Sequence, residues 1–312
     1  MSGEIISIAF DSKAPPEQSP GVPAVHSRGR TASVSTGALD RLPQVEAALH
    51  YLAPMNERPR SFAYELPPGV ATSNARSERH KVIVRDARPI ADFLRLDDEG
   101  LQLVQNKSRV RDFLDDEVVK SVYYGEAEKL VASVTGARWV LAFDHTVRRK
   151  IYGVADRTPG MPRQPAVLVH NDYTERSGPQ RLRDLTGEAS PALLHRRFAI
   201  VNVWRPIRGP LHDSPLAVCD ANSVHADDLV PSDLVFRDRV GETYAVRYNA
   251  EHRWLYFPGM SRDEVLLIKC YDSALDGTAR FTPHCAFEDP SAPADRVPRE
   301  SLELRTFAFF DT

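Results

Sequence analysis

The chain has few cysteines and no closely spaced pair of them. Its 312 residues include only Cys219, Cys270 and Cys285, and no two of these form a CxxC motif. An odd number of widely spaced thiols argues against a disulfide scaffold and against a cysteine-rich zinc site. We therefore expect the protein to work in a reducing compartment, the cytoplasm.

Long apolar runs and a strong net charge are also missing. No run approaches the roughly 20 apolar residues that span a bilayer, and the N-terminus lacks the basic start and apolar core of a signal peptide. The formal net charge is −3, which provides no overall basic field to hold nucleic acid. These absences predict a protein with neither a membrane nor a nucleic-acid partner.

Several common catalytic and nucleotide-binding motifs are absent. The sequence contains no GxGxxG fingerprint after a strand, no GxxxxGK[ST] phosphate loop, no HExxH zinc motif and no GxSxG nucleophile elbow. The sequence therefore gives no motif evidence for a dinucleotide-binding enzyme, a P-loop enzyme or a serine hydrolase of the elbow type.

The N-terminal part divides into a leader and a region with helical signals. Residues 11–37 are rich in Pro, Ser, Gly and Arg, so we expect residues 1–37 to form a loosely ordered leader arm. The remaining residues, 38–312, are expected to form a single domain, with 38–137 as a mainly helical support region. Apolar spacing predicts helices over 39–52 and, most clearly, 113–137, whereas 59–66 and 80–88 alternate like strands.

From residue 138 onward, short apolar runs recur between turn signals. The runs occupy residues 138–148, 165–173, 198–207, 215–224, 244–258, 263–273, 279–289 and 300–310. One helical insertion, 180–198, separates the second run from the third. Strands at this spacing are typical of a sandwich or barrel. The sequence therefore predicts an α+β protein whose core, 138–312, is a jelly roll, or double-stranded β-helix.

The stretch Leu168–Gln180, LVHNDYTERSGPQ, presents a histidine and an aspartate at the end of an apolar run. His170 and Asp172 are two residues apart, so they project to the same face of a strand. With one more histidine they would form the two-His-one-carboxylate triad that binds Fe(II) and leaves three positions open. Zinc accepts the same ligands. His252 and His284 are the candidates for the third ligand.

We favour His284 because a possible cosubstrate site follows it. Arg299 and Ser301 begin the last apolar run and share one face by the period of two. A guanidinium and a hydroxyl together suit the distal carboxylate of 2-oxoglutarate. The alternative interpretations are ordinary: HxD arises by chance in many proteins, the histidines pack in a core, and Arg299 lies at a solvated strand start.

Several longer segments of the sequence are distinctive: VHNDYTERSGPQR, FAIVNVWRPI, PLAVCDANS, HRWLYFPGMSRDEVLLIKCYDS, TPHCAFEDP and PRESLELR, with FLDDEVVKSVYYGEAEKLV in the N-terminal third. Through these segments the chain resembles the hydroxylase/desaturase family of fungal and bacterial specialised metabolism. The family includes the fungal gibberellin desaturase, the aspergillic acid hydroxylase and a component of cephamycin 7-hydroxylation. Its members are non-haem oxygenases that use Fe(II), 2-oxoglutarate and O2 on a double-stranded β-helix.

The resemblance implies roles for particular residues. His170, Asp172 and His284 would hold iron, while Arg299 and Ser301 would anchor 2-oxoglutarate. Further candidates near the cosubstrate are Asn202, Trp204 and Arg205, and the last of these competes with Arg299 for its carboxylate. Tyr173 and Tyr256 are candidates for the substrate side, although packing is the simpler interpretation of both.

The implied reaction is hydroxylation or desaturation of an unactivated C–H bond in a small metabolite, through hydrogen abstraction by a ferryl species. Two other classes stay open from the residues alone. One is a jelly-roll binding or scaffold protein without redox chemistry. The other is a cupin-like metalloenzyme that uses His252 and no oxo acid. A homodimer, served by the leader, is also expected.

Overall fold

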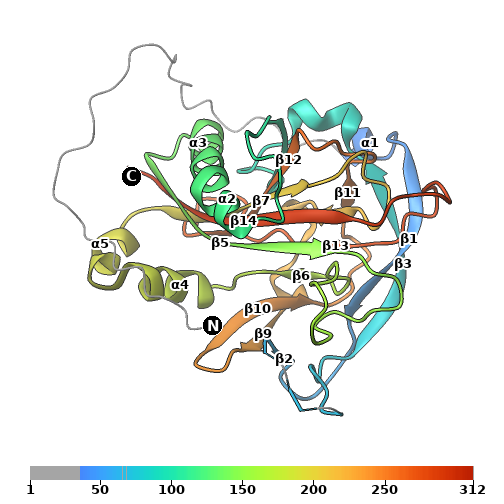
Figure 1. Cartoon of the computed structure of the whole chain (residues 1–312), viewed down its shortest axis with the longest axis horizontal. Coiled ribbons are helices and arrows are strands. Elements are labelled where there is room, and N and C mark those ends of the chain that lie inside the picture. Colours follow the sequence, from blue (N-terminus) through green and yellow to red (C-terminus); the bar gives the residue numbers. More distant parts are fainter. Residues whose placement is uncertain (1–35, 65, 68, 312) are drawn as a thin grey trace.

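Two β-sheets pack face to face in the part of the chain that the computed structural model describes, residues 36–64, 66–67 and 69–311 (Figure 1). The five-stranded sheet has the order β4 (Leu101–Gln105), β12 (Glu264–Asp272), β7 (Phe198–Pro206), β14 (Glu300–Phe309) and β5 (Trp139–Arg149). The nine-stranded sheet has the order β1 (Gln44–Leu52), β3 (Ser77–Asp86), β11 (Trp254–Tyr256), β8 (Leu216–Cys219), β13 (His284–Ala286), β6 (His170–Asn171), β10 (Val240–Val246), β9 (Leu229–Val235) and β2 (Arg60–Phe62).

The strands after residue 138 agree with the sequence prediction. Each of the eight predicted runs contains at least one strand, and most of the pairing between neighbours is antiparallel. The one strand in this part that the sequence did not indicate is β9, which contains Pro231. The two facing sheets confirm the predicted jelly-roll core.

Alternation along the strands creates separate apolar layers on the two faces of the five-stranded sheet. On β14, Phe307 and Phe309 belong to the core between the sheets. Leu302 and Leu304 point the other way, into a second core beneath a helix. That helix runs through α2 (Asp116–Val118), a π-helical turn η2 (Val119–Tyr123) and α3 (Tyr124–Thr135), and α3 contacts β5, β14 and β7 (Figure 1).

Local signals at both ends explain where this helix begins and ends. The Asp115 side chain accepts hydrogen bonds from the backbone N–H groups of Glu117 and Val118, which satisfies donors at the first turn. At the other end Gly136 adopts the left-handed conformation, with φ of 70°. The helix predicted within 113–137 is therefore confirmed.

The helix expected over 39–52 is wrong. Only Thr36–Leu39 forms a short helix, α1, and residues 44–52 form β1, which pairs with β3 along its whole length. Ala47, Leu49 and Tyr51 are buried while the intervening residues are less so, and this is a period of two rather than 3.6. Because β1 to β4 all lie within residues 38–137, the expected mainly helical character of that region is also wrong.

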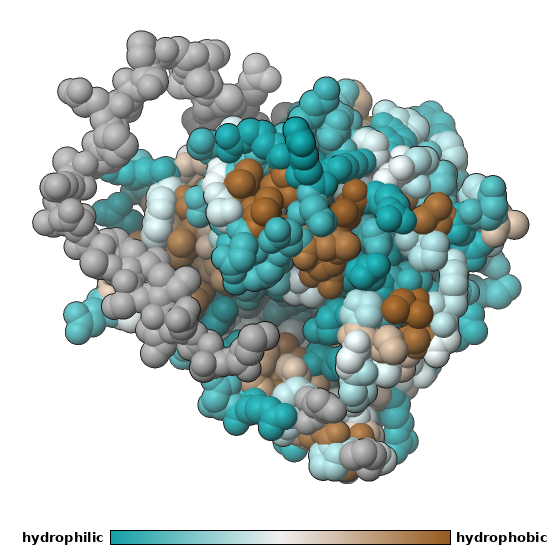
Figure 2. All heavy atoms as spheres, viewed as in Figure 1, coloured by the Kyte–Doolittle hydropathy of each residue, from teal (hydrophilic) through white to brown (hydrophobic). Residues whose placement is uncertain are grey.

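The remaining helical segments are short. The predicted insertion is confirmed as α4 (Ser177–Thr186), η3 (Gly187–Ala189) and α5 (Ser190–Leu194), and the other 3-10 turns are η1 (Arg88–Phe93), η4 (Ala221–Ser223) and η5 (Ala226–Asp228). No helix among the described residues combines the length and apolar character needed to cross a membrane. On the face drawn in Figure 2, hydrophobic residues gather in several separate patches between hydrophilic ones. The expected leader arm, 1–37, lies almost entirely outside the described residues.

Candidate active site

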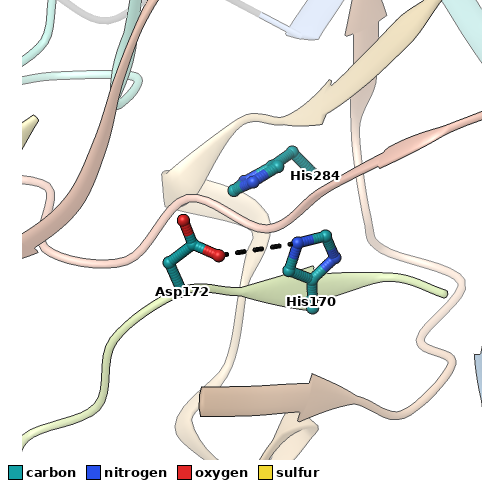
Figure 3. Close-up of side chains that lie close together, drawn as sticks. All are labelled: His170, Asp172 and His284. Atoms are coloured by element: carbon teal, nitrogen blue, oxygen red, sulfur yellow. Dashed lines mark ion pairs between the residues drawn. The ribbon is translucent and has the colours of Figure 1, made fainter. Parts of the chain in front are cut away.

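Two adjacent strands of the nine-stranded sheet bring three metal-ligating side chains together (Figure 3). His170 lies on β6, Asp172 follows that strand, and His284 begins β13 directly opposite His170. One ligand atom from each of the three lies within 4.8 Å of the others. His284 also pairs with Val218, a residue of the core between the sheets. The triad therefore faces the interior of the jelly roll.

Both imidazoles are oriented by the same local contact. The Nδ1 atom of His170 lies 2.8 Å from the carbonyl oxygen of Leu168, and that of His284 lies 3.0 Å from the carbonyl oxygen of Thr282. Each ring can donate Nδ1–H to its carbonyl, which leaves the lone pair on Nε2. The buried Nε2 atom of His284 has no hydrogen-bond partner among the described residues. A metal ion is the ligand that this donor set fits.

The electrostatic surroundings put His170 and Asp172 in the protonation states that a metal requires. Burial, followed by the neighbouring His284, lowers the pKa of His170 to about 4, so the imidazole is neutral at neutral pH. Burial alone would raise the pKa of Asp172, but the Arg305 guanidinium and the two imidazoles hold it below its usual range. The site thus offers the neutral imidazole of His170 and the carboxylate of Asp172 beside the unpartnered Nε2 atom of His284.

Asp172 has two protein partners, and one of them carries no sequence signal. Its Oδ2 atom accepts hydrogen bonds from Asn202 Nδ2 at 2.8 Å and from Arg305 Nε at 3.0 Å. Asn202 was expected near the cosubstrate, and the structure places its amide against the metal-ligating carboxylate. The sequence analysis missed Arg305, because an arginine at an alternate position of a strand is a common feature.

A second group of cationic side chains lies on the inner face of the five-stranded sheet. Arg299 is 2% exposed, donates from Nε to Ser301 Oγ at 2.9 Å and lies over the Trp204 ring at 5.0 Å. Arg148, on β5, pairs with Ser301 in the sheet register and donates to the carbonyl oxygen of Gln164 at 2.8 Å. Within the described part of the chain, neither guanidinium forms an ion pair with a carboxylate.

The charge of Arg148 acts on Arg299. Burial, followed by the charge of Arg148, lowers the pKa of Arg299 to about 9, so Arg299 still carries its charge at neutral pH. The pKa of Arg148 is lowered as well, first by burial and then by Arg163. Arg299 is buried and Arg148 is partly buried, and two such positive charges without a carboxylate partner are costly unless an anion joins them. The sequence analysis missed Arg148, because only the register between β5 and β14 places it beside Ser301.

Arg205 does not compete with Arg299, and that expectation is corrected. Successive residues of a strand point to opposite faces, so Arg205 faces away from its neighbour Trp204. Its guanidinium lies over the rings of Phe113 and Tyr123, at 5.1 and 5.3 Å, in the core beneath the helix. Its Nη2 atom donates to the carbonyl oxygen of Asn106 at 2.8 Å.

Two other candidates also lie away from the triad. Tyr256 belongs to a third core on the opposite face of the nine-stranded sheet, 5.3 Å from the Phe287 ring, so its expected place beside the substrate is corrected. His252 stacks on the Tyr51 ring beside the same core, and its Nε2 atom lies 3.1 Å from Oδ2 of Asp228. Tyr173, in contrast, packs in the core between the sheets.

A glycine behind the site restricts the segment that orients His284. Gly100 has φ of +83°, and a Cβ there would lie 2.2 Å from Oγ1 of Thr282, the residue whose carbonyl contacts His284.

We expect Gly100→Ala to lower the free energy of unfolding by about 2–4 kcal/mol, through backbone strain and overpacking together. Urea unfolding measures the loss. Gly136→Ala is the matched control, because its φ is also positive but its Cβ would meet nothing within 4 Å. Equal losses in the two variants would contradict the predicted clash.

A jelly roll that carries an inward-facing two-His-one-carboxylate set defines a metal-dependent enzyme of the non-haem iron type. A family model described as oxidoreductase/YMDC permease-like domain matches residues 49–309. The hydroxylase/desaturase efuI of Hormonema carpetanum is 34% identical over 264 residues, which cover 78% of this chain and 88% of the relative. The Fe(II)/2-oxoglutarate-dependent dioxygenase nvfI of Aspergillus novofumigatus is 32% identical over 250 residues, which cover 78% of this chain and 87% of the relative.

A solved structure agrees with these relatives. The iron and α-ketoglutarate-dependent endoperoxidase NvfI superposes with a TM-score of 0.76 at 31% identity, covering 86% of this chain and 98% of that chain. The chain therefore belongs to the oxidoreductase family of the hydroxylases/desaturases and Fe(II)/2-oxoglutarate-dependent dioxygenases. The resemblance seen in the sequence is confirmed, and with it the class of cofactor, iron with 2-oxoglutarate and O2.

Proposed function

We propose that this enzyme hydroxylates or desaturates an unactivated C–H bond of a small specialised metabolite, with Fe(II) held by His170, Asp172 and His284. The observation that carries the proposal is the convergence of three ligand atoms within 4.8 Å on the inner face of a jelly roll. When bound there, Fe(II) with 2-oxoglutarate and O2 supplies the oxidant that removes hydrogen from the substrate. The protein binds and orients the reactants and keeps water away.

Substrate is proposed to enter beside the triad on the side of Tyr173. This residue is only 9% exposed and packs among the apolar side chains between the sheets. Burial, followed by the charge of Asp144, holds the pKa of its hydroxyl well above the ordinary value. The hydroxyl stays protonated and can donate a hydrogen bond to a substrate oxygen.

The distal carboxylate of 2-oxoglutarate is proposed to bind between Arg299 and Arg148, with Ser301 completing the site. The absence of a carboxylate partner for either guanidinium in the described part of the chain supports this role. A bound dicarboxylate would relieve the repulsion between the two cations. Trp204 is proposed to hold the plane of Arg299 by stacking.

Removing Arg148 should weaken 2-oxoglutarate binding without releasing iron. Loss of one hydrogen-bonded charge costs about 1.5–3 kcal/mol, which corresponds to a Kd about 10- to 150-fold higher in Arg148→Gln. Anaerobic titration of the Fe(II)-loaded enzyme with 2-oxoglutarate measures this constant. Arg149→Gln is the matched control, because Arg149 is the next residue, lies half-exposed and pairs with Glu300. An unchanged Kd in Arg148→Gln would remove Arg148 from the cosubstrate site.

The proposed function is tested directly by turnover. Purified protein is loaded with Fe(II) without oxygen and then assayed for succinate formed from 2-oxoglutarate with candidate metabolites. Absence of Fe(II) binding would favour a jelly-roll binding protein without redox chemistry. Substrate oxidation with iron and oxygen but no oxo acid would favour the cupin-like alternative.

The cellular setting is proposed to be the cytoplasm, with the enzyme as a homodimer. The three cysteines are buried and free, which supports a reducing compartment. The homodimer stays a prediction, because it was attributed to the leader arm, which lies almost entirely outside the described residues.

A further inference from the structure

The two oxygens of Asp172 have different surroundings. Oδ2 accepts one hydrogen bond from Asn202 Nδ2 at 2.8 Å and one from Arg305 Nε at 3.0 Å. Oδ1 instead faces His170 Nε2 at 3.6 Å, on the side of the two imidazoles (Figure 3). The lone pairs of Oδ2 are thus engaged by protein donors, and Oδ1 is the oxygen left for a metal.

We propose that Asn202 and Arg305 are positioning residues that keep Asp172 a one-oxygen metal ligand. The inference rests on the proposed iron site. A carboxylate that bound through both oxygens would take up one of the three positions that the triad leaves open. With Fe(II) bound, the open positions would be needed by the oxo acid and by dioxygen. The two donors on Oδ2 therefore protect the coordination position that the reaction requires.

The sheet holds both donors in place. Asn202 on β7 and Asp144 on β5 are the register partners of Arg305 on β14, so the three side chains form one row across adjacent strands. Arg305 is further held by Asp144 at 3.0 Å, by Thr146 at 3.3 Å and by an ion pair with Glu303. A guanidinium tied at each nitrogen has little freedom to leave Asp172, and sites built on strands hold such geometry well.

A variant of Asn202 can distinguish the orientation of Asp172 from the balance of charge around it. Arg305 also forms ion pairs with Asp144 and Glu303, so its removal alone would not distinguish positioning from charge balance. Asn202 is neutral and fully buried, and its amide donates to the same Oδ2 atom. An effect of Asn202 on metal geometry would therefore point to positioning.

The experiment uses Co(II) as the metal probe in full-length wild-type, Asn202→Ala, Arg305→Gln and Arg305→Lys proteins. Competition with a chelator gives the Kd, and the visible absorption of Co(II), which weakens as the coordination number rises, reports the ligand geometry. We expect a Kd about 10- to 100-fold higher in Asn202→Ala and Arg305→Gln, the usual effect of removing an outer partner of a ligand. The absorption should weaken as the second oxygen binds. Arg305→Lys should recover part of both signals, because an ammonium keeps the charge but lacks the planar fork.

Thr146→Val is the matched control, because it removes a partner of Arg305 but neither donor to Asp172, and it should leave both signals unchanged. A wild-type protein that binds no Co(II) through His284 would overturn the proposed function itself. Wild-type binding with an unchanged Kd and spectrum in Asn202→Ala would overturn only the positioning role. Weaker binding with an unchanged spectrum would overturn it too, because the second oxygen would not have bound. If Arg305→Gln does not fold, Asn202→Ala decides.

Discussion

The His284→Ala variant should fold and yet retain no Fe(II) after desalting, with loss of coupled succinate formation. The substitution removes a buried nitrogen that has no partner in the described part of the chain, so the protein loses a ligand but keeps its hydrogen bonds other than the Nδ1 contact to Thr282. Metal affinity should fall by more than the loss of about 10- to 100-fold that follows removal of an outer partner of a ligand. Iron content and urea unfolding of the metal-free protein measure the two effects separately.

His252→Ala provides the contrast. His252 is the other histidine that the sequence offered as a third ligand, but it lies by Asp228 and by the Tyr51 hydroxyl in a different core. Its removal should lower the free energy of unfolding by about 1–3 kcal/mol, because buried partners lose their hydrogen bonds, while iron content stays normal. Iron loss in His252→Ala with retention in His284→Ala would support the cupin-like enzyme instead.

The sequence predicted the triad because its signals are local. His170 and Asp172 are two residues apart, which places both on one face at the point where β6 ends. The choice of His284 over His252 depended on Arg299 and Ser301 further along the chain and on the resemblance. The pairing of β13 with β6 could not be read from either segment alone, because register between distant strands depends on the whole sheet.

The errors also have physical causes. Residues 44–52 contain alanines and leucines at spacings that suit a helix, and their pairing with β3 overrides that preference. Arg205 is a different case, because the alternation of β7 already places it opposite Asn202 and Trp204. Asn202, Trp204 and Arg205 cannot all face one cavity, because the period of two that places Arg299 and Ser301 on one face puts Arg205 on the other face of β7.

Partners that meet across strands were beyond reach of the sequence. Arg305 and Arg148 carry the same charge and occupy similar strand positions. Arg305 forms ion pairs with carboxylates, whereas Arg148 has no carboxylate partner in the described part of the chain. Only the register of β5, β14 and β7 distinguishes them. The roles of charged residues on the inner face are thus set by tertiary neighbours rather than by local pattern.

The Arg299→Gln variant should bind iron normally but require far more 2-oxoglutarate. A fork that grips a carboxylate contributes two charged hydrogen bonds of about 1.5–3 kcal/mol each, so the Kd for 2-oxoglutarate should rise by about two orders of magnitude or more. Anaerobic titration gives the Kd, and turnover at saturating 2-oxoglutarate should recover most of the activity, because the triad is intact.

Arg205→Gln is the fitting comparison, because Arg205 is as deeply buried as Arg299 and also bonds to a backbone carbonyl. It should lower stability through the lost contacts with Phe113 and Tyr123 but leave the Kd for 2-oxoglutarate unchanged. A crippled cosubstrate affinity in Arg205→Gln together with a normal one in Arg299→Gln would reverse the assignment of the anchor. It would also mean that β7 presents the opposite face to the triad.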